Sequence, residues 1–244
     1  MKPVRVAING FGRIGRVTAR LLLQRTDIQL VAVNDLTDTL TLAHLFKYDS
    51  VHGVFAGEVG HDDTHLLLGG HTIKAFAEKV PSVLPWKALG IDVVLECTGH
   101  FLTRELASAH LKAGARRVIL SAPAKDPDIK SVVLGVNEHL LEATDDMISN
   151  ASCTTNCAAP MIKVVQDFCG IESGYITTVH SYTGDQRLHD APHKDLRRAR
   201  AAAVSMVPTT TGAAKAITRI FPELDGKLGG GGIRVQKEQK NRRP

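Results

Sequence analysis

The sequence has no long hydrophobic run and few cysteines, and each shortage excludes a class of protein. No apolar stretch approaches the ~20 residues that a membrane-spanning helix needs, and the first apolar run is short and interrupted by Arg5, unlike a secretory signal. Four cysteines without zinc-ribbon spacing are too few for a disulfide scaffold, so we expect reduced thiols. We therefore expect a cytoplasmic protein with no metal site and no membrane partner.

Positive charge exceeds negative charge only slightly, and the excess is concentrated at one end. The chain has 244 residues, with 30 Lys and Arg against 25 Asp and Glu, a formal net charge of +5. Residues 227–244 contain six basic residues and one acidic residue, which equals the whole excess. Because residues 236–244 lack aromatic side chains on which bases could stack, we interpret them as a solvated, disordered basic tail and expect no nucleic-acid partner.

Short hydrophobic runs alternate with helical patterns through the first 150 residues. The expected strands are 4–8, 30–33, 93–95, 118–120, 132–134 and 147–148, and the expected helices are 14–22 and 106–112. Strands that alternate with helices indicate a parallel sheet covered on both faces. We expect a doubly wound, Rossmann-type α/β domain over residues 1–152.

The pattern changes after Asn150, where we expect a second domain over residues 153–235. The expected elements are a helix at 158–168, a strand at 175–179, a long ordered loop at 188–200, a turn at 208–212 and a helix that ends near 220. Cys157 and Cys169 are interpreted as small apolar groups on a buried helix face.

Three glycines follow the first expected strand and open the first expected helix. Gly10, Gly12 and Gly15 form the pattern G-x-G-x-x-G, in which the first makes a tight turn, the second admits a pyrophosphate and the third allows close packing. Asp35 ends the second expected strand, where a carboxylate binds a ribose 2′-hydroxyl and repels a 2′-phosphate. This pattern predicts an NAD site; the alternative is a tight turn with Asp35 capping a loop.

A second candidate site contains Cys153, which lies between an expected strand and an expected helix. A helix N-terminus favours thiolate over thiol, which makes a cysteine nucleophilic. His180 ends the expected strand at 175–179 and could exchange a proton with that thiol. If the helix begins at Cys153, Pro160 falls inside it, whereas a start near residue 158 places Pro160 in the first turn. The alternative is an inert thiol and an unrelated histidine.

Taken together, these motifs resemble glyceraldehyde-3-phosphate dehydrogenases from Val4 to about Val235. The strings that carry the resemblance are residues 9–16, 34–35, 47–53, 121–123, 135–137, 149–157, 180–183, 196–203 and 211–215. The resemblance implies an NAD-dependent enzyme of glycolysis with a catalytic domain whose sheet is mostly antiparallel. In the implied reaction, Cys153 attacks glyceraldehyde 3-phosphate with His180 as the base, and inorganic phosphate releases 1,3-bisphosphoglycerate from the thioester.

The resemblance also implies roles for further residues. Those that resemble NAD contacts are Arg13, Ile14, Asp35, Lys79 and Ser121. Those that resemble the site of the attacking phosphate are Ser152, Thr154, Arg198, Thr211 and Gly212. Thr183 and Arg234 match the groups that hold the substrate's own phosphate, for which a hydroxyl and a guanidinium are suited.

The chain departs from the family pattern in three places. Gly184 stands where the family has an asparagine near the cofactor, and Ala191 stands where NAD-specific relatives have leucine, although Asp35 still favours NAD. Beyond Val235 the resemblance ends, whereas the family continues with further strands and a helix. We therefore expect a truncated catalytic domain with an exposed sheet edge and low stability, and the loss of part of the interface through which the family forms homotetramers.

Two alternatives to the triose enzyme remain open from the sequence. One is a remnant that binds NAD without catalysis, and the other is an enzyme similar to erythrose-4-phosphate dehydrogenase. Thr183 and the intact string at 211–215 favour the triose enzyme over the second alternative.

Overall fold

The chain divides between Ser152 and Cys153 into two compact units. The computed structural model describes residues 2–209 and 211–236. No helix within these ranges is long and apolar enough to cross a membrane. The expected disorder of the tail at 236–244 concerns residues that, apart from Gln236, lie outside the described ones.

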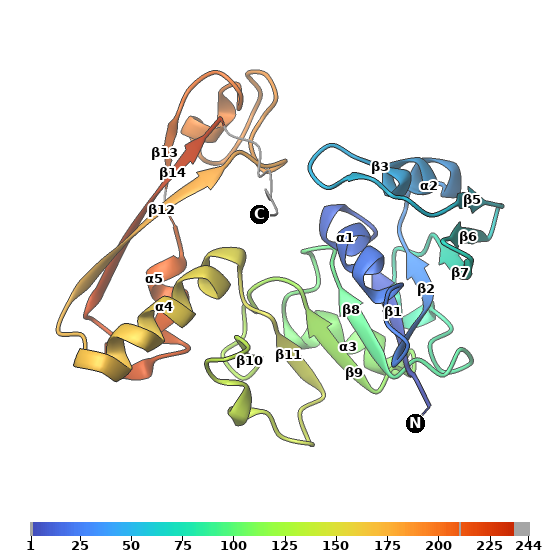
Figure 1. Cartoon of the computed structure of the whole chain (residues 1–244), viewed down its shortest axis with the longest axis horizontal. Coiled ribbons are helices and arrows are strands. Elements are labelled where there is room, and N and C mark those ends of the chain that lie inside the picture. The colour runs from blue at the N-terminus through green and yellow to red at the C-terminus, as the bar shows by residue number, and fades with distance from the viewer. Residues whose placement is uncertain (1, 210, 237–244) are drawn as a thin grey trace. The chain divides into compact units, whose positions relative to one another are not determined.

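In its described residues the first unit contains a nine-stranded sheet (Figure 1). The strands are β1 (Val4–Asn9), β2 (Ile28–Asn34), β5 (Val59–His61), β6 (His65–Leu68), β7 (His71–Phe76), β8 (Val93–Glu96), β9 (Arg117–Leu120), β10 (Lys130–Ser131) and β11 (Met147–Ser149). The spatial order is β10-β11-β9-β8-β1-β2-β7-β6-β5. Strands from β10 to β7 pair in parallel, and β6 and β5 add an antiparallel edge. The expected Rossmann-type sheet is confirmed.

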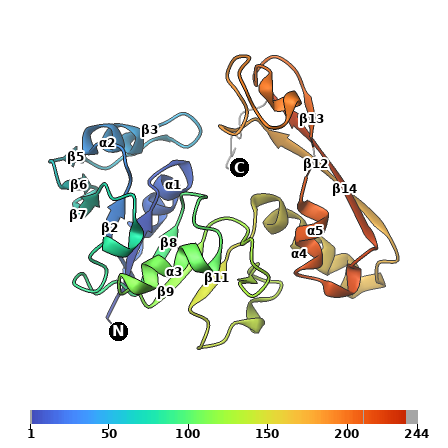
Figure 2. The same cartoon turned by 180° about the vertical axis from the view of Figure 1, so that it is seen from behind.

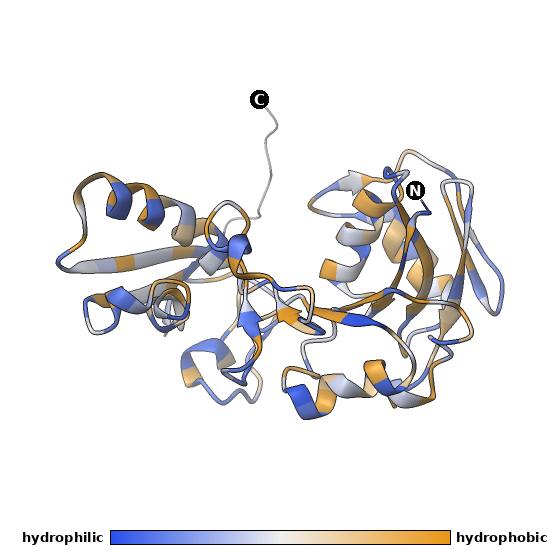
Figure 3. Ribbon diagram, turned by 90° about the horizontal axis from the view of Figure 1, so that it is seen from below, coloured by the Kyte–Doolittle hydropathy of each residue, from blue (hydrophilic) through white to orange (hydrophobic). Residues whose placement is uncertain are grey.

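Helices cover both faces of this sheet. α1 (Arg13–Leu22) lies in front of the sheet in Figure 1, whereas α3 (Arg104–Lys112) lies in front in Figure 2, which is seen from behind. Adjacent residues of a strand point to opposite faces, and accordingly Ile8 packs in the core beside α1 while Ala7 packs in a second core with Trp86. α3 carries both hydrophobic and hydrophilic residues in Figure 3, as expected for a helix with one buried side.

Two parts of the first unit differ from the sequence analysis. No element was expected between the second strand and residue 93, where the structure has α2 (Thr39–Lys47), the hairpin of β3 (Tyr48–Asp49) and β4 (Gly53–Val54), and the three strands β5 to β7. The strand expected at 132–134 is wrong: β10 occupies residues 130–131. The chain leaves the sheet because the backbone N–H of Val133 donates to Oδ1 of Asn137, at 2.8 Å, instead of continuing the ladder.

The second unit combines a three-stranded sheet with two helices in its described residues. Its elements are α4 (Cys153–Cys169), β12 (Gly174–Ser181), β13 (Val207–Thr209), α5 (Ala213–Thr218) and β14 (Leu228–Val235). The central strand β14 pairs antiparallel with β13, as expected of the catalytic sheet, and parallel with β12. The ring of Tyr175 lies against Gly229 and Gly231, where an added Cβ would meet its atoms at 2.8 and 2.7 Å. An aromatic ring thereby covers backbone that has no side chains of its own.

Three further expectations for the second unit are corrected. α4 begins at Cys153, so Pro160 lies inside the helix and cannot donate to the carbonyl of Asn156. Cys157 and Cys169 are exposed, so their assignment to a buried helix face is wrong. Pro208, expected in a turn, belongs to β13, a strand at the sheet edge, where a missing N–H is tolerated.

Candidate functional site

The glycine loop between β1 and α1 has the geometry that each glycine was expected to provide. Gly10 has a φ of +92°, and an added Cβ would lie 2.7 Å from the backbone nitrogen of Thr98. A Cβ on Gly15 would lie 2.2 Å from the carbonyl oxygen of Gly10, so only glycine allows this contact between helix and loop. Around Gly12, the N-cap of α1, a Cβ would meet nothing within 4 Å. The start of the helix is therefore open to a ligand.

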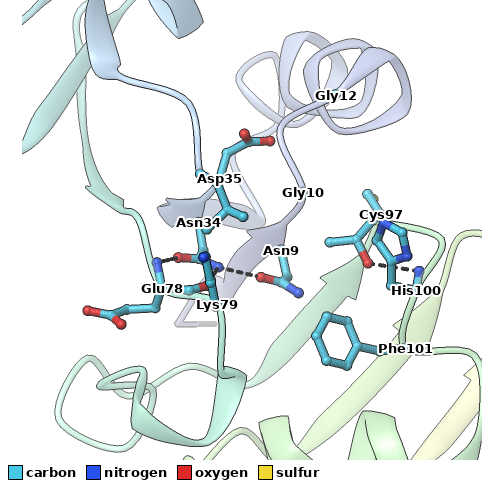
Figure 4. A pocket seen from close by; sticks show the side chains of 12 residues that line it. Asn9, Gly10, Gly12, Asn34, Asp35, Glu78, Lys79, Cys97, His100 and Phe101 are labelled. Atoms are coloured by element: carbon cyan, nitrogen blue, oxygen red, sulfur yellow. Dashed lines mark hydrogen bonds between the residues drawn. The ribbon is translucent and has the colours of Figure 1, made fainter.

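A cavity of about 480 Å³ lies at the carboxyl ends of β1, β2 and β8 (Figure 4). It is lined by Asn9, Gly10, Gly12, Asn34, Asp35, Leu36, Glu78, Lys79, Cys97, Thr98, His100 and Phe101. Ligands of open parallel sheets bind at this edge, and the volume is typical of small-molecule sites. The structure thus brings four of the predicted cofactor residues, Gly10, Gly12, Asp35 and Lys79, into one cavity.

The other predicted cofactor residues lie outside the lining of this cavity. Arg13 and Ile14 form the first turn of α1 and are both about half exposed, and Gly15 is buried against the loop. Ser121 follows β9, where its backbone N–H donates to the carbonyl of Glu96 at 3.0 Å.

Asp35 lines the cavity and also accepts hydrogen bonds from backbone N–H groups of nearby loops. Its carboxylate accepts the backbone N–H of Phe11 at 2.7 Å and that of Thr37 at 3.1 Å. A carboxylate has about four acceptor positions, so these two bonds leave capacity for the hydroxyls of a ribose. With the open N-terminus of α1 available for a phosphate, the side chains and backbone groups present fit NAD.

Asp49 is a charged residue beside this site that the sequence analysis did not identify. Its carboxylate is buried, accepts the backbone N–H groups of Val51 and His52 at 2.8 Å each, and pairs with the guanidinium of Arg13 at 3.2 Å. Burial alone would raise the pKa of Asp49, but the two backbone hydrogen bonds and Arg13 lower it well below its ordinary value. Asp49 therefore anchors a cation on the first turn of α1. Asp49 belongs to the string at 47–53 that carries the family resemblance, but that string does not indicate that Arg13 is the partner of Asp49.

Cys97 lines the cavity as an inert thiol. Burial raises the pKa of Cys97 to about 11, Ser121 opposes the shift through a hydrogen bond, and the charge of Glu96 adds to it. At neutral pH this cysteine remains protonated and is a poor nucleophile.

The second unit brings Cys153 and His180 together. Cys153 is the first residue of α4 and His180 lies near the end of β12, and Sγ of the cysteine is 3.4 Å from Nε2 of the histidine. Nδ1 of His180 lies 2.7 Å from the carbonyl oxygen of Ser181. A carbonyl only accepts hydrogen bonds, so Nδ1 carries a proton and Nε2 faces the sulfur as the site of proton exchange.

The register of the second sheet places Arg234 beside this pair. His180 of β12 and Arg234 of β14 are partners across the sheet. Nη1 of Arg234 is 3.1 Å from Nδ1 of His180, 3.3 Å from the carbonyl oxygen of Ser181 and 3.5 Å from Oγ1 of Thr183. Since a guanidinium only donates, its hydrogen bonds go to the two oxygens. Burial and the charge of Arg198 lower the pKa of Arg234, while Asp185 and Cys153 oppose that shift.

Arg198 is held by residues that the sequence analysis did not select. Its guanidinium pairs with Asp185 and donates from Nε to Oγ1 of Thr209 at 2.9 Å. Burial would raise the pKa of Asp185, but Arg198, with a smaller contribution from His193, lowers it. Arg234 thus lies within electrostatic range of both Cys153 and Arg198, and two neighbouring arginines suit a site for anions.

The remaining predicted residues lie close to this cluster along the chain. Ser152 and Thr154 flank Cys153 along the chain, and Gly212 is the N-cap of α5. The Cβ of Thr211 lies 3.6 Å from the position of a Cβ on Gly232, which is two residues from Arg234.

No group of His, Cys, Asp and Glu within the described ranges has the geometry of a metal site.

Comparison with known proteins gives matches over both units. Residues 4–104 match a family model described as glyceraldehyde 3-phosphate dehydrogenase, NAD binding domain, and residues 152–241 match one described as the C-terminal domain of the same family. The chain is 55% identical over 233 residues to the glyceraldehyde-3-phosphate dehydrogenase of Clostridium pasteurianum, which covers 95% of the chain and 70% of that protein. It is 57% identical over 233 residues to that of Geobacillus stearothermophilus, with 95% and 69% covered. It is 60% identical over 218 residues to that of Thermotoga maritima, with 88% and 65% covered.

Proposed function

Because the chain belongs to the glyceraldehyde-3-phosphate dehydrogenase family, we propose that it oxidises glyceraldehyde 3-phosphate to 1,3-bisphosphoglycerate with NAD and inorganic phosphate. The observation that carries the proposal is the separation of 3.4 Å between Sγ of Cys153 and Nε2 of His180. A thiol and an imidazole at this separation can exchange a proton, as covalent catalysis by cysteine requires.

In the first step the sulfur of Cys153 forms a bond to the aldehyde carbon. The thiol proton moves to Nε2 of His180, which passes it to the aldehyde oxygen, so a thiohemiacetal forms on the enzyme and Nε2 is again unprotonated. His180 then accepts the hydroxyl proton of the thiohemiacetal as a hydride leaves its carbon, and a thioester remains on Cys153. Bound NAD supplies the acceptor for that hydride.

In the second step a phosphate oxygen attacks the thioester carbon. The carbon–sulfur bond breaks, the acyl phosphate leaves, and Cys153 recovers its proton from His180. Arg234 with Thr183 would hold the phosphate that the substrate carries, and Arg198 would hold the attacking phosphate. Both assignments rest on the two guanidinium groups, of which Arg234 lies within electrostatic range of Cys153 and of Arg198, since arginine binds phosphate oxygens through paired N–H donors.

The cofactor residues complete the proposal. Gly10, Gly12 and Gly15 shape the loop that faces the pyrophosphate, Asp35 accepts from ribose, and Lys79 lines the same cavity. The lining of the cavity does not include Arg13, Ile14 or Ser121. These three residues would contact only a part of the cofactor that extends out of the cavity.

The test is NADH formation, followed by absorbance, from glyceraldehyde 3-phosphate, NAD and phosphate. We expect a rate that requires all three and disappears in Cys153→Ala, with Cys169→Ala as the control because that exposed cysteine lies at the other end of α4. A folded chain that binds NAD without turnover would identify a cofactor-binding remnant instead. A higher rate with erythrose 4-phosphate would contradict the assigned substrate.

A further inference from the structure

A chain of buried hydrogen bonds runs beneath the cofactor cavity and has no part in the chemistry proposed above. The indole N–H of Trp86 donates to Nδ1 of His110 at 3.1 Å, and Nε2 of His110 lies 3.0 Å from Oε2 of Glu96. The amide of Asn9 donates to the same Oε2 at 2.6 Å, and the amide of Asn34 donates to Oδ1 of Asn9 at 2.7 Å. Three strands and α3 are thereby joined through side chains alone.

The direction of every bond in this chain follows from its ends. An indole N–H can only donate, so Nδ1 of His110 accepts and the proton of the neutral ring is on Nε2, which donates to Glu96. On the other side, Asn34 accepts the backbone N–H of Glu78 at 2.8 Å through Oδ1, which turns its amide toward Asn9. Both arms therefore end as donors on the carboxylate of Glu96.

Glu96 also fixes the opposite side of the cavity. Its second oxygen, Oε1, accepts the backbone N–H of Thr98 at 2.7 Å and the Thr98 hydroxyl. Glu96 and His110 are fully buried, and no ion pair with Lys or Arg is found for Glu96 within the described residues. The four donors alone compensate the carboxylate, so each of them is needed.

The two sides that Glu96 connects are the two walls of the cofactor cavity. Asn34, Asp35, Glu78 and Lys79 form one wall, and the segment Cys97–Phe101 forms the other, with Asn9 between them (Figure 4). We propose that Glu96 and His110 are positioning residues that hold these walls at the separation required by a dinucleotide. The inference rests on the cofactor binding of the proposed function and adds two residues that do not line the cavity.

The variant Glu96→Gln tests this inference, because it keeps the shape of the side chain and replaces one acceptor oxygen by an amide donor. That donor must face either the pair Asn9 and His110 or Thr98, so one wall is released. We expect the dissociation constant of NAD, measured by calorimetry with the full chain, to rise at least tenfold. AMP, which is one half of the dinucleotide and depends less on the separation of the walls, should bind within threefold of its wild-type affinity.

Asp92→Asn is the matched control. Asp92 lies just before β8, at the opposite end of the strand from Glu96, and accepts the backbone N–H of Arg5 at 2.9 Å. It should lower the melting temperature without changing the ratio of the NAD and AMP affinities. Equal losses for NAD and AMP in Glu96→Gln would show general damage and overturn the inference, as would an unchanged affinity for NAD.

Variants at His110 keep the inference testable if Glu96→Gln does not fold. His110→Leu removes the donor to Glu96 and should weaken NAD binding, whereas His110→Gln can still donate to Glu96 and accept from Trp86 and should restore most of it. Equal affinities in the two variants would overturn the inference. If the wild-type chain itself does not bind NAD, the proposed function fails; if it binds NAD and Glu96→Gln binds equally well, only the inference fails.

Discussion

Sγ of Cys153 lies 3.4 Å from Nε2 of His180, and the proton on Nδ1 of that histidine is held by the carbonyl of Ser181. The nitrogen that faces the sulfur is therefore the one able to take a proton from it. Because removal of a general base typically lowers rates by about 10²–10⁴-fold, we expect His180→Asn to reduce kcat by that range. It should also slow alkylation of Cys153 by iodoacetamide.

Cys169 gives an internal control for the alkylation. It is exposed at the far end of the same helix, and its sulfur faces the backbone oxygens of Val165 and Gly170 rather than an imidazole. Mass spectrometry of the two labelled peptides should show slower labelling of Cys153 alone. Equal slowing of both cysteines, or of neither, would contradict a proton-exchanging pair.

The glycine loop allows the fold and the cofactor site to be perturbed separately. In Gly10→Ala the new Cβ would lie 2.7 Å from the backbone of Thr98 at a φ of +92°, so we expect a loss of about 3 kcal/mol in the free energy of unfolding. In Gly12→Ala the Cβ meets nothing within 4 Å, so stability should change by less than about 1 kcal/mol.

Cofactor affinity should respond differently in these two variants. The methyl group of Gly12→Ala projects where the helix N-terminus is open, so NAD binding should weaken in a protein that melts normally. Denaturant unfolding and NAD titration of both variants provide the measurement. A Gly12→Ala protein with full NAD affinity would show that the pyrophosphate does not approach this backbone.

Features carried by neighbouring residues in the chain were the ones that sequence could predict. Residues close together in the chain predict the turn at Gly10, the acid at Asp35 and the strand-to-helix junction at Cys153. The parallel sheet follows because short hydrophobic runs alternate with helical patterns. The bond between Glu96 and Asn9 and the pair of Asp49 with Arg13 join residues 87 and 36 positions apart, and no local pattern identifies such partners.

The predicted ends of one helix and one strand were wrong because tertiary and side-chain contacts override the local pattern. The helix of Cys153 continues through Pro160 because tertiary packing of buried residues such as Ala158 and Ala159 outweighs the missing hydrogen bond. The strand expected at 132–134 ends early because Asn137, four residues beyond Val133, accepts its N–H. Both outcomes depend on contacts that hydrophobic periodicity does not encode.

The free energy of unfolding should depend on pH because of the lowered pKa of Asp49. Its pKa in the folded protein is lower than the ordinary value near 3.8, because two backbone N–H groups and Arg13 stabilise the carboxylate. The stabilisation is therefore complete above that ordinary value and is lost as the pH falls toward the folded pKa. We expect Asp49→Asn to lower the free energy of unfolding by about 2 kcal/mol at pH 7.

The difference between wild type and Asp49→Asn should shrink between pH 4 and pH 2. Urea unfolding at several pH values measures it. Asp27→Asn is the control, since Asp27 pairs with Arg25 on the surface, where both side chains are exposed. A difference that stays constant across this pH range would show that the carboxylate charge of Asp49 is not what stabilises the loop.

The two units should differ in their resistance to local unfolding. Of the largest fully buried side chains among the described residues, Ile217 is the one from the second unit, and all others belong to the first. Phe168, Tyr175 and Val179 of the second unit are 89%, 70% and 67% exposed, so little apolar surface covers β12 and the end of α4. Burial of apolar surface is the main favourable term in folding. We therefore expect local unfolding of the second unit to cost less free energy than local unfolding of the first.

Hydrogen exchange of matched strand pairs tests this difference. β1 with β2 and β12 with β14 are both parallel pairs, the first with one register shift between Val6 and Ala7, so amides hydrogen-bonded across each pair can be compared while the cores beneath them differ. We expect amides of β12 and β14 to exchange at least tenfold faster than those of β1 and β2. Because local opening exposes amides in proportion to its equilibrium constant, equally strong protection in both pairs would contradict the inference that burial, rather than strand pairing, sets the stability of each unit.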